Sequence, residues 1–160
     1  MLEFHKAYIE NGVVMANKKV GKVIKLFISK KGDSQRYEES FIELDEEGVI
    51  GDKFYAKDTI RSVLITSTDS YELVQKYDIE IPHGYLGENI LMDFNPYSLP
   101  VGSQLKIGSA LLEISQNCTI CNHLSTIDKR VPKLLKNDRG IFAKVVQGGK
   151  ISQEDDIYLV

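Results

Sequence analysis

The chain contains two cysteines, Cys118 and Cys121, and only two residues separate them. They follow an apolar run at residues 110–114 that favours a β-strand, and they precede residues 124–135, which could form a helix. A thiol at the start of a helix lies near unpaired backbone N–H groups and the positive end of the helix dipole, and both favour the thiolate. A thiolate attacks electrophilic sulfur, binds soft metals or carries a persulfide. This segment is therefore the first candidate for chemistry.

Other interpretations of the cysteine pair have to be weighed. A thioredoxin-type dithiol requires a strand–CxxC–helix unit within a βαβ pattern, which the strand-rich sequence does not supply. Two inert buried thiols are an open alternative, because cysteine is among the most buried residue types. A structural zinc site needs four ligands. Besides the cysteines, the chain offers three histidines without a second pair at metal-ligand spacing: His5, His83 and His123.

Glycine-rich turns precede two groups of polar side chains. The first turn lies within residues 47–55 and contains Asp52, and the second lies within residues 84–91 and contains Glu88 and Asn89. Glycine lets the backbone approach another group closely, so these side chains could present acceptors and a donor at the rim of a pocket. The alternative is that both turns are structural, because polar side chains of this kind often stabilise turns.

Two arginines, Arg61 and Arg139, each introduce an apolar run. Such an arginine is either a solvated charge at the edge of a sheet or a planar donor group directed at an anion. The sequence on its own leaves both interpretations open.

The composition limits the functional classes. At 160 residues, with 42% hydrophobic and 27% charged residues, the chain is long enough for one globular domain. A net charge of −3 argues against sequence-independent binding to nucleic-acid phosphates. No apolar run approaches the roughly 20 residues that span a bilayer, and residues 1–6 lack the pattern of a secretory signal. We therefore expect a cytoplasmic protein with reduced thiols that binds neither nucleic acid nor membrane.

The order of predicted elements indicates a mainly β protein with a few short helices. We expect about seven to nine short strands, a short helix near residues 71–77, and a second helix from Leu124 until Pro132 interrupts it. Because two helices are too few to cover a parallel sheet, we expect a closed or nearly closed β-barrel. A single domain is predicted at residues 18–160. Residues 1–17 are predicted to be an N-terminal extension, as an added strand, a flexible arm or a subunit contact.

Seven short patterns follow one another along the chain, and each is weak by itself. In order they are Gly48-x-x-Gly51-Asp52, Arg61 with Val63-Leu64, Gly84-x-x-Gly87-Glu88-Asn89-Ile90, Gly102-x-x-Leu105-x-Ile107-Gly108-x-Ala110-x-Leu112, Cys121-x-x-Leu124, Arg139-Gly140-x-x-Ala143-x-Val145 and Gly148-Gly149-x-Ile151. Together they resemble the MOSC domain family, which includes the C-terminal domain of molybdenum-cofactor sulfurases and free-standing bacterial proteins. The resemblance runs from about Gly21 to Ile157 and implies a strand-rich fold with a MOSC-type β-barrel core.

The resemblance implies that Cys121 is the signature cysteine of the family, because Leu124 follows it at the third position. Members of the family are thought to carry sulfur on this cysteine as a persulfide, or to hold a molybdenum–pterin cofactor (molybdopterin) through it. Cys121 is thus the expected catalytic residue and metal ligand. The residues expected to line the cofactor pocket are Asp52, Arg61, Glu88, Asn89 and Arg139.

Different functional hypotheses follow from this resemblance. The first is a sulfur carrier or molybdenum-cofactor-binding protein that acts through Cys121, as a sulfurtransferase or as a reductase of N-hydroxylated compounds. The alternative is a non-catalytic module that binds or delivers the cofactor. Expected partners are a cysteine desulfurase or a molybdoenzyme, together with an anionic small molecule. The chain departs from the family pattern at Ile120, where proline is common, and at Phe54, where histidine is common, so a degenerate domain with an inert thiol is a further alternative.

Overall fold

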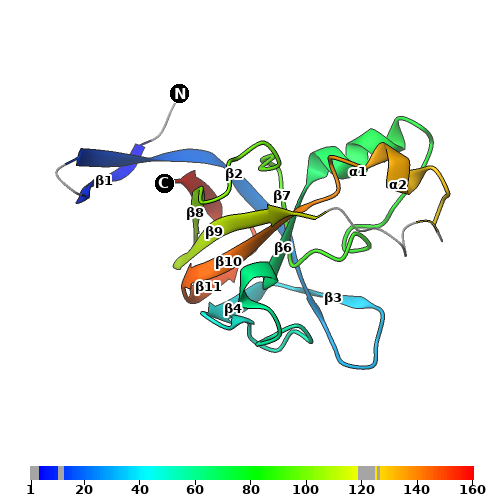
Figure 1. Ribbon diagram of the computed structural model, residues 1–160, viewed down its shortest axis with the longest axis horizontal. Helices are drawn as coiled ribbons and strands as arrows, with labels where there is room; N and C mark the ends of the chain where they lie inside the picture. The colour runs from blue at the N-terminus through cyan, green and yellow to red at the C-terminus, as the bar shows by residue number, and fades with distance from the viewer. Residues whose placement is uncertain (1–3, 11–12, 119–124, 126) are drawn as a thin grey trace.

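The computed structural model describes residues 4–10, 13–118, 125 and 127–160. Figure 1 shows a barrel of strands with a two-stranded ribbon on one side and two short helices on the opposite side. The described elements are, in chain order, β1 (Phe4–Glu10), β2 (Val13–Ser29), β3 (Arg36–Glu39), β4 (Phe41–Asp45), β5 (Gly48–Val49), the 3₁₀-helix η1 (Thr59–Arg61), β6 (Val63–Ser67), α1 (Thr68–Gln75), β7 (Ile90–Met92), β8 (Gln104–Ile107), β9 (Ala110–Asn117), α2 (Val131–Leu134), β10 (Ile141–Gln147), β11 (Gly149–Ser152) and β12 (Asp156–Leu159).

Seven strands form a closed barrel, which confirms the predicted fold class. Their order around the barrel is β2, β12, β8, β9, β10, β6 and β7, and the pairing of β7 with β2 closes the ring. Among the described strands of the ring, neighbours are antiparallel except β6 and β7, which are parallel. A second sheet consists of β11, β4 and β5 and contacts the barrel through β9, β2 and β10.

The apolar residues form two cores. The larger core fills the barrel with aliphatic side chains such as Leu26, Ile65 and Leu112, all of which are fully buried. The second core lies where the helices cover the barrel, and it joins Tyr71 and Val74 of α1 to side chains of β2, β7 and α2. The turn that holds Asp52 lies between β5 and η1, and the turn that holds Glu88 and Asn89 directly precedes β7.

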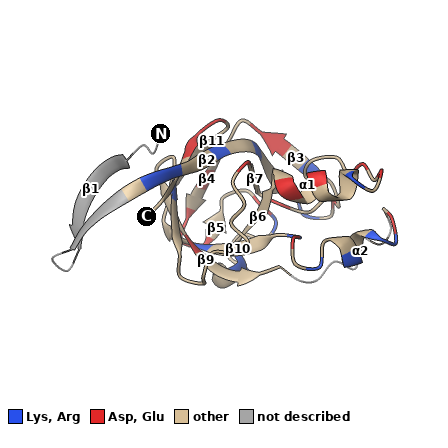
Figure 2. Cartoon of the chain, turned by 90° about the horizontal axis from the view of Figure 1, so that it is seen from above, with Lys and Arg blue, Asp and Glu red and all other residues tan. Residues whose placement is uncertain are grey.

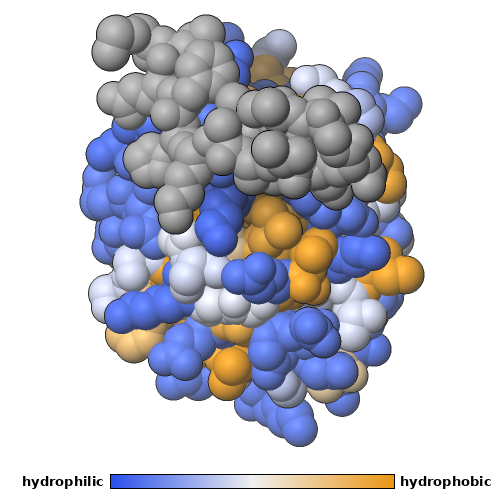
Figure 3. All heavy atoms as spheres, turned by 90° about the vertical axis from the view of Figure 1, so that its left-hand side faces the viewer, coloured by the Kyte–Doolittle hydropathy of each residue, from blue (hydrophilic) through white to orange (hydrophobic). Residues whose placement is uncertain are grey.

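β2 is the longest described strand and organises the sheet. From its N-terminal to its C-terminal end it pairs in turn with β1, β12, β7 and β3. Its first part and β1 form the ribbon that leaves the barrel (Figure 1), so β1 is an added strand within the predicted extension. Figure 2 shows acidic residues on β3 and α1. The face that carries this ribbon is largely hydrophilic, with small groups of hydrophobic side chains between the hydrophilic ones (Figure 3).

The first predicted helix is present, whereas the prediction of the second was wrong about its start. Ser67 caps α1, and its hydroxyl accepts a hydrogen bond from the N–H of Asp69. Residues 127–130 are turns or irregular, and α2 begins at Val131 with Pro132 in its first turn. Proline starts this helix rather than ending it, because its missing N–H is not needed in a first turn. Within the described ranges, neither helix is long and apolar enough to cross a bilayer.

Candidate functional site

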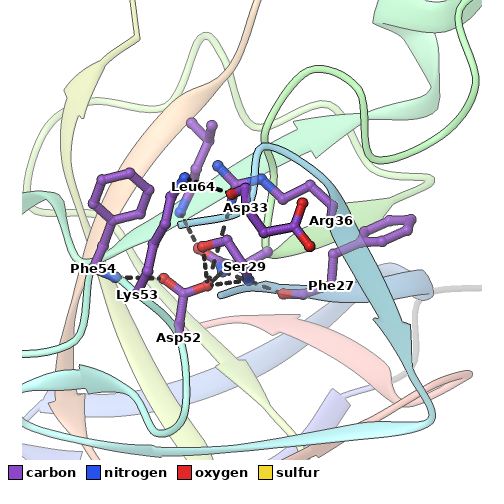
Figure 4. Close-up of polar contacts among 9 residues, drawn as sticks. Phe27, Ser29, Asp33, Arg36, Asp52, Lys53, Phe54 and Leu64 are labelled. Atoms are coloured by element: carbon purple, nitrogen blue, oxygen red, sulfur yellow. Dashed lines mark hydrogen bonds and ion pairs between the residues drawn. The ribbon is translucent and has the colours of Figure 1, made fainter. Parts of the chain in front are cut away.

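The carboxylate of Asp52 is buried and accepts hydrogen bonds from three neighbouring residues. Its Oδ1 accepts from the N–H and the hydroxyl of Ser29, at 2.7 and 2.8 Å, and from the amide of Asn89 at 3.3 Å. Its Oδ2 accepts from the N–H of Phe54 at 3.1 Å. Figure 4 shows this carboxylate between Ser29 and Phe54. Asp52 therefore fastens the loop after β5 to the end of β2, and both of its oxygens are in use.

Asn89, also buried, connects the strands on either side of β7. Its Oδ1 accepts from the N–H of Leu64 in β6 at 3.1 Å, and its Nδ2 donates to the carbonyl oxygen of Phe27 in β2 at 3.2 Å. The backbone of Asn89 adds two further bonds to the same residues, because its N–H donates to Leu64 and its carbonyl accepts from Phe27. The side chain thus completes the barrel where β2, β6 and β7 meet.

Glu88 has no exposed surface, and within the described residues only one of its two oxygens has partners. Its Oε2 accepts from the hydroxyl of Thr66 at 2.6 Å and from the hydroxyl of Tyr71, which in turn accepts from the N–H of Gly84 at 3.1 Å. Burial raises the pKa of Tyr71, and the charge of Glu88 raises it further, so the phenol stays protonated and donates. Oε1 has no hydrogen-bond partner among the described residues.

Arg139 lies between α2 and β10 and is only 4% exposed. Its Nε and Nη1 atoms are buried and have no hydrogen-bond partner in the described part of the chain. A buried cationic donor without an acceptor is strongly unfavourable, so such atoms mark a place where a ligand or an ordered water completes the site.

A second guanidinium, that of Arg36 at the start of β3, reaches the same place. A Cβ atom added to Gly87 would lie 3.4 Å from Nη2 of Arg36 and 3.9 Å from Nη2 of Arg139. Burial lowers the pKa of Arg36, against the opposing effect of the nearby carboxylates of Asp52 and Glu88, and the positive charge of Arg139 lowers it further. Two guanidinium groups therefore lie beside Gly87, and the carboxylates of Asp52 and Glu88 are close enough to act on Arg36.

The described contacts of Arg61 are with residues outside the cluster around Gly87. Its Nε donates to Asp58 at 3.0 Å, and its guanidinium lies 5.8 Å from the ring centroid of Phe142. The residue is exposed, and no described contact joins it to the other predicted site residues. A role for Arg61 in cofactor binding stays a prediction.

An open cleft with positively charged walls lies beside Asp52. Phe54 stands next to it, 47% exposed, with its ring centroid 5.7 Å from the guanidinium of Arg36 and 5.2 Å from the amine of Lys53. The side chain that departs from the family pattern therefore supplies an aromatic face to two cations. The lysines that line the cleft are Lys30, Lys31, Lys53 and Lys57.

The predicted catalytic residue, Cys121, lies outside the described residues. Cys118 is buried, and its N–H donates to the carbonyl oxygen of Gly140 at 3.0 Å, which extends the pairing of β9 with β10. Gly140 directly follows Arg139 in the sequence. The helix that was expected to begin at Leu124 is α2, which begins at Val131.

Sequence reasoning missed two residues of this cluster as functional candidates, Arg36 and Tyr71. Arg36 precedes the polar run Tyr37-Glu38-Glu39 rather than an apolar one, so the pattern that singled out Arg139 did not apply. Tyr71 was recognised only as an apolar position of a helix. Its position on the buried face of α1 is the available signal, since a buried tyrosine hydroxyl usually finds a polar partner.

The donor set of the cluster suits an anion. The free nitrogens of Arg139 and the guanidinium of Arg36 fit the phosphate end of a molybdenum–pterin cofactor, because paired guanidinium groups bind phosphate oxygens well. Within the described ranges, no group of three or more His, Cys, Asp or Glu side chains could hold a metal ion.

Comparisons with known proteins agree with this fold. The sequence model of the MOSC domain matches residues 52–158, and a search of curated proteins gave no match. The solved structure of YuaD from Bacillus subtilis is similar with a TM-score of 0.75 at 17% identity, over 87% of this chain and 94% of that one. YiiM from Escherichia coli gives a TM-score of 0.64 at 19% identity, over 87% and 69% of the two chains. YiiM from Geobacillus stearothermophilus gives 0.65 at 16% identity, over 88% and 73%.

Proposed function

Because this chain belongs to the MOSC domain family, we propose that it acts through the thiolate of Cys121, either as a sulfur carrier or as a protein that binds the molybdenum cofactor. In the sulfur reaction, the thiolate attacks the outer sulfur of a persulfide on a donor protein such as a cysteine desulfurase. The S–S bond of the donor breaks, the donor cysteine leaves as a thiolate, and Cys121 keeps the sulfur as a persulfide. Sulfur changes carrier without any net oxidation or reduction.

One observation supports this proposal beyond family membership: the buried cationic donors of Arg139 have no described partner, and the backbone of the next residue, Gly140, pairs with that of Cys118. The N–H of Cys118 donates to Gly140, the residue after Arg139. A guanidinium near a thiol favours its ionised form and attracts anionic reactants. Cys121 follows Cys118 by three residues in the sequence, and we propose that this charge acts on its thiol.

The same residues would hold the cofactor in the second version of the function. Arg139 would bind its phosphate, whereas Asp52 and Asn89 would keep the surrounding loops in place through the hydrogen bonds described above. Arg61 would contribute charge at the surface. When bound, a molybdenum–pterin group supplies two-electron redox chemistry, such as the reduction of an N-hydroxylated compound.

Mass spectrometry of the intact protein tests the sulfur reaction. We expect the protein, after incubation with a cysteine desulfurase and free cysteine, to gain the mass of one sulfur atom, and we expect the Cys121→Ser variant to gain none. Cys118→Ser is the matched control, and it should still accept sulfur. A persulfide that persists in Cys121→Ser would show that the sulfur lies on another residue.

Metal analysis and an activity assay separate the enzyme from the delivery module. The protein is purified from cells that make the molybdenum cofactor and is assayed for reduction of an N-hydroxylated base. Bound molybdenum with turnover would support a reductase, whereas bound molybdenum without turnover would support a module that serves a molybdoenzyme. If the protein forms the persulfide and binds no molybdenum, the result would support the sulfur-carrier function.

A further inference from the structure

We infer that Arg36, Arg139 and Glu88 form a subsite for a phosphate group that retains a proton, either free phosphate or the phosphate of an organic monoester. The inference rests on the proposed function in one respect, because it names the ligand class of the same site. It goes beyond that function in assigning Glu88 to recognition and in distinguishing phosphate from other oxyanions.

The positive side of the subsite consists of the two guanidinium groups. Their Nη2 atoms flank one point beside Gly87, at 3.4 and 3.9 Å from where a Cβ would lie. Like charges at such short range repel each other, and this repulsion contributes to the lowered pKa of Arg36. An anion between the two groups removes the repulsion and supplies acceptors for the unpaired donors of Arg139.

Asp52 does not already perform this role. Nη1 of Arg36 forms an ion pair with Oδ1 of Asp52 at 3.9 Å, a distance that is too long for a hydrogen bond. That oxygen is already occupied by the donors of Ser29 and Asn89. Arg139 makes no ion pair with any described carboxylate. The two guanidinium groups therefore keep unused donors inside the protein.

The negative side of the subsite is Oε1 of Glu88. The side chain has no exposed surface, and this oxygen has no described donor, whereas Oε2 accepts from Thr66 and Tyr71. The charge of Glu88 is close enough to Arg36 to raise the pKa of that guanidinium. A ligand that contacts both the arginines and Oε1 of Glu88 must offer acceptors to the arginines and a proton to the glutamate.

A phosphate group with one remaining proton meets both requirements. Its charged oxygens accept from Arg36 and Arg139, and its O–H donates to Oε1 of Glu88. Sulfate carries no proton at neutral pH and would place a negative oxygen against the buried carboxylate. A buried acceptor that stays unpaired, or faces another negative charge, lowers affinity strongly.

Calorimetric titration with inorganic phosphate tests the subsite, with sulfate as the comparison ligand and constant ionic strength throughout. We expect saturable phosphate binding that is at least tenfold tighter than sulfate binding. Arg36→Gln and Arg139→Gln should each weaken phosphate binding at least tenfold, since each removes charged hydrogen bonds. The matched control is Arg130→Gln, because Arg130 is exposed and pairs with Asp128, and it should bind phosphate as the unchanged protein does.

Glu88→Gln tests the selectivity separately from the affinity. Removing the negative charge should improve sulfate binding and bring the two oxyanions close to equal affinity. Circular dichroism of each variant verifies that it is folded, and Arg36→Gln is the decisive variant if the more deeply buried Arg139 is needed for folding. A titration with phenyl phosphate then identifies the source: binding equal to that of phosphate points to a monoester, and much weaker binding points to the free ion.

The assignment is overturned if the protein does not bind phosphate saturably, if Arg130→Gln loses as much affinity as Arg36→Gln, or if sulfate binds as well as phosphate before Glu88 is changed. These outcomes are independent of the persulfide assay. A protein that forms the persulfide on Cys121 without binding phosphate would retain the proposed function and lose only this subsite.

Discussion

The two glycine-rich turns that contain Asp52 and Glu88 have similar sequences, but the hydrogen bonding of their carboxylates differs. Asp52 lies after Gly51, which has a φ of +89°, and all of its oxygens accept hydrogen bonds from the protein. Glu88 lies after Gly87, which has the same φ of +89°, and one of its oxygens has no described partner. In the first turn the protein itself satisfies the carboxylate and so stabilises the loop. In the second turn one carboxylate oxygen stays available to a ligand.

The difference shows that the hydrogen bonding of a buried charged group distinguishes a structural role from a binding role. A carboxylate whose hydrogen bonds are all made within the protein stabilises the fold and has little left for a ligand. Glu88 and the neighbouring Arg139 keep donors and an acceptor unused in the described part of the chain. Such groups cost stability unless something else binds to them, so proteins keep them where they serve function. Substitutions in the two turns should therefore have contrasting effects.

The largest effect is expected at Asp52. Asp52→Asn replaces an acceptor by an amide that faces the donors of Ser29, Asn89 and Phe54. We expect the free energy of unfolding to fall by about 3 kcal/mol, because buried donors lose a charged acceptor. Urea denaturation measures this. The control is Asp58→Asn, which removes an exposed carboxylate and should lower the free energy of unfolding by less than about 1 kcal/mol. Equal losses in both variants would contradict the structural role of Asp52.

The next effect compares the two glycines. Gly51→Ala and Gly87→Ala both place a side chain at a φ of +89°, so each should cost about 1–2 kcal/mol of stability. The two positions differ in the room available for a side chain. A Cβ on Gly51 meets nothing within 4 Å, whereas a Cβ on Gly87 lies against the guanidinium groups of Arg36 and Arg139. Calorimetry should show weaker phosphate binding for Gly87→Ala alone. A similar loss in Gly51→Ala would mean that backbone strain, and not the occupied space, is responsible.

A smaller effect on stability is expected at Arg139. Arg139→Met removes a buried cation without described partners and keeps an unbranched side chain of similar length. The free energy of unfolding should change by less than about 1 kcal/mol or rise, since replacing a poorly paired buried charge by an apolar group is often neutral or stabilising. Urea denaturation without phosphate in the buffer is the measurement. A loss as large as that of Asp52→Asn would show that the protein itself pairs this guanidinium.

The smallest effect concerns His83, whose ring lies 4.8 Å from that of Tyr71. Burial lowers the pKa of His83, the charge of Lys25 also lowers it, and the charge of Glu88 raises it. Glu88→Gln should therefore lower the pKa of His83 further, and an NMR titration of its ring protons measures this. An unchanged value would mean that Glu88 does not act on His83 as a charge.

The same shift has a consequence for stability. Because the pKa of His83 is lower in the folded state than in the unfolded state, its contribution is fully present above the unfolded value of about 6.5 and is lost as pH falls toward the folded value. His83→Gln should therefore reduce the decline in stability between neutral and mildly acidic pH. A steeper decline in the variant would contradict the direction of the shift.

Several features of the site could be predicted from the sequence. Asp52, Glu88 and Asn89 stood out through the glycines before them, and in the structure all three are buried and Asn89 donates a hydrogen bond to Asp52. The sequence could not tell which of them would be saturated, because each partner comes from a distant strand. Asn89 and Phe27, for example, are 62 residues apart in the chain.

The sequence by itself determined the barrel, because alternating and continuous apolar runs are local signals of strands that must bury one or both faces. It also determined the family, through seven short patterns in order. Only the tertiary structure decided that Arg36 joins Arg139 beside Gly87 and that Asp52 is used up by Ser29. Hydrogen-bond satisfaction depends on three-dimensional neighbours, and the register of β2 with β3, which places Ser29 opposite Arg36, is set by pairing rather than by either segment alone.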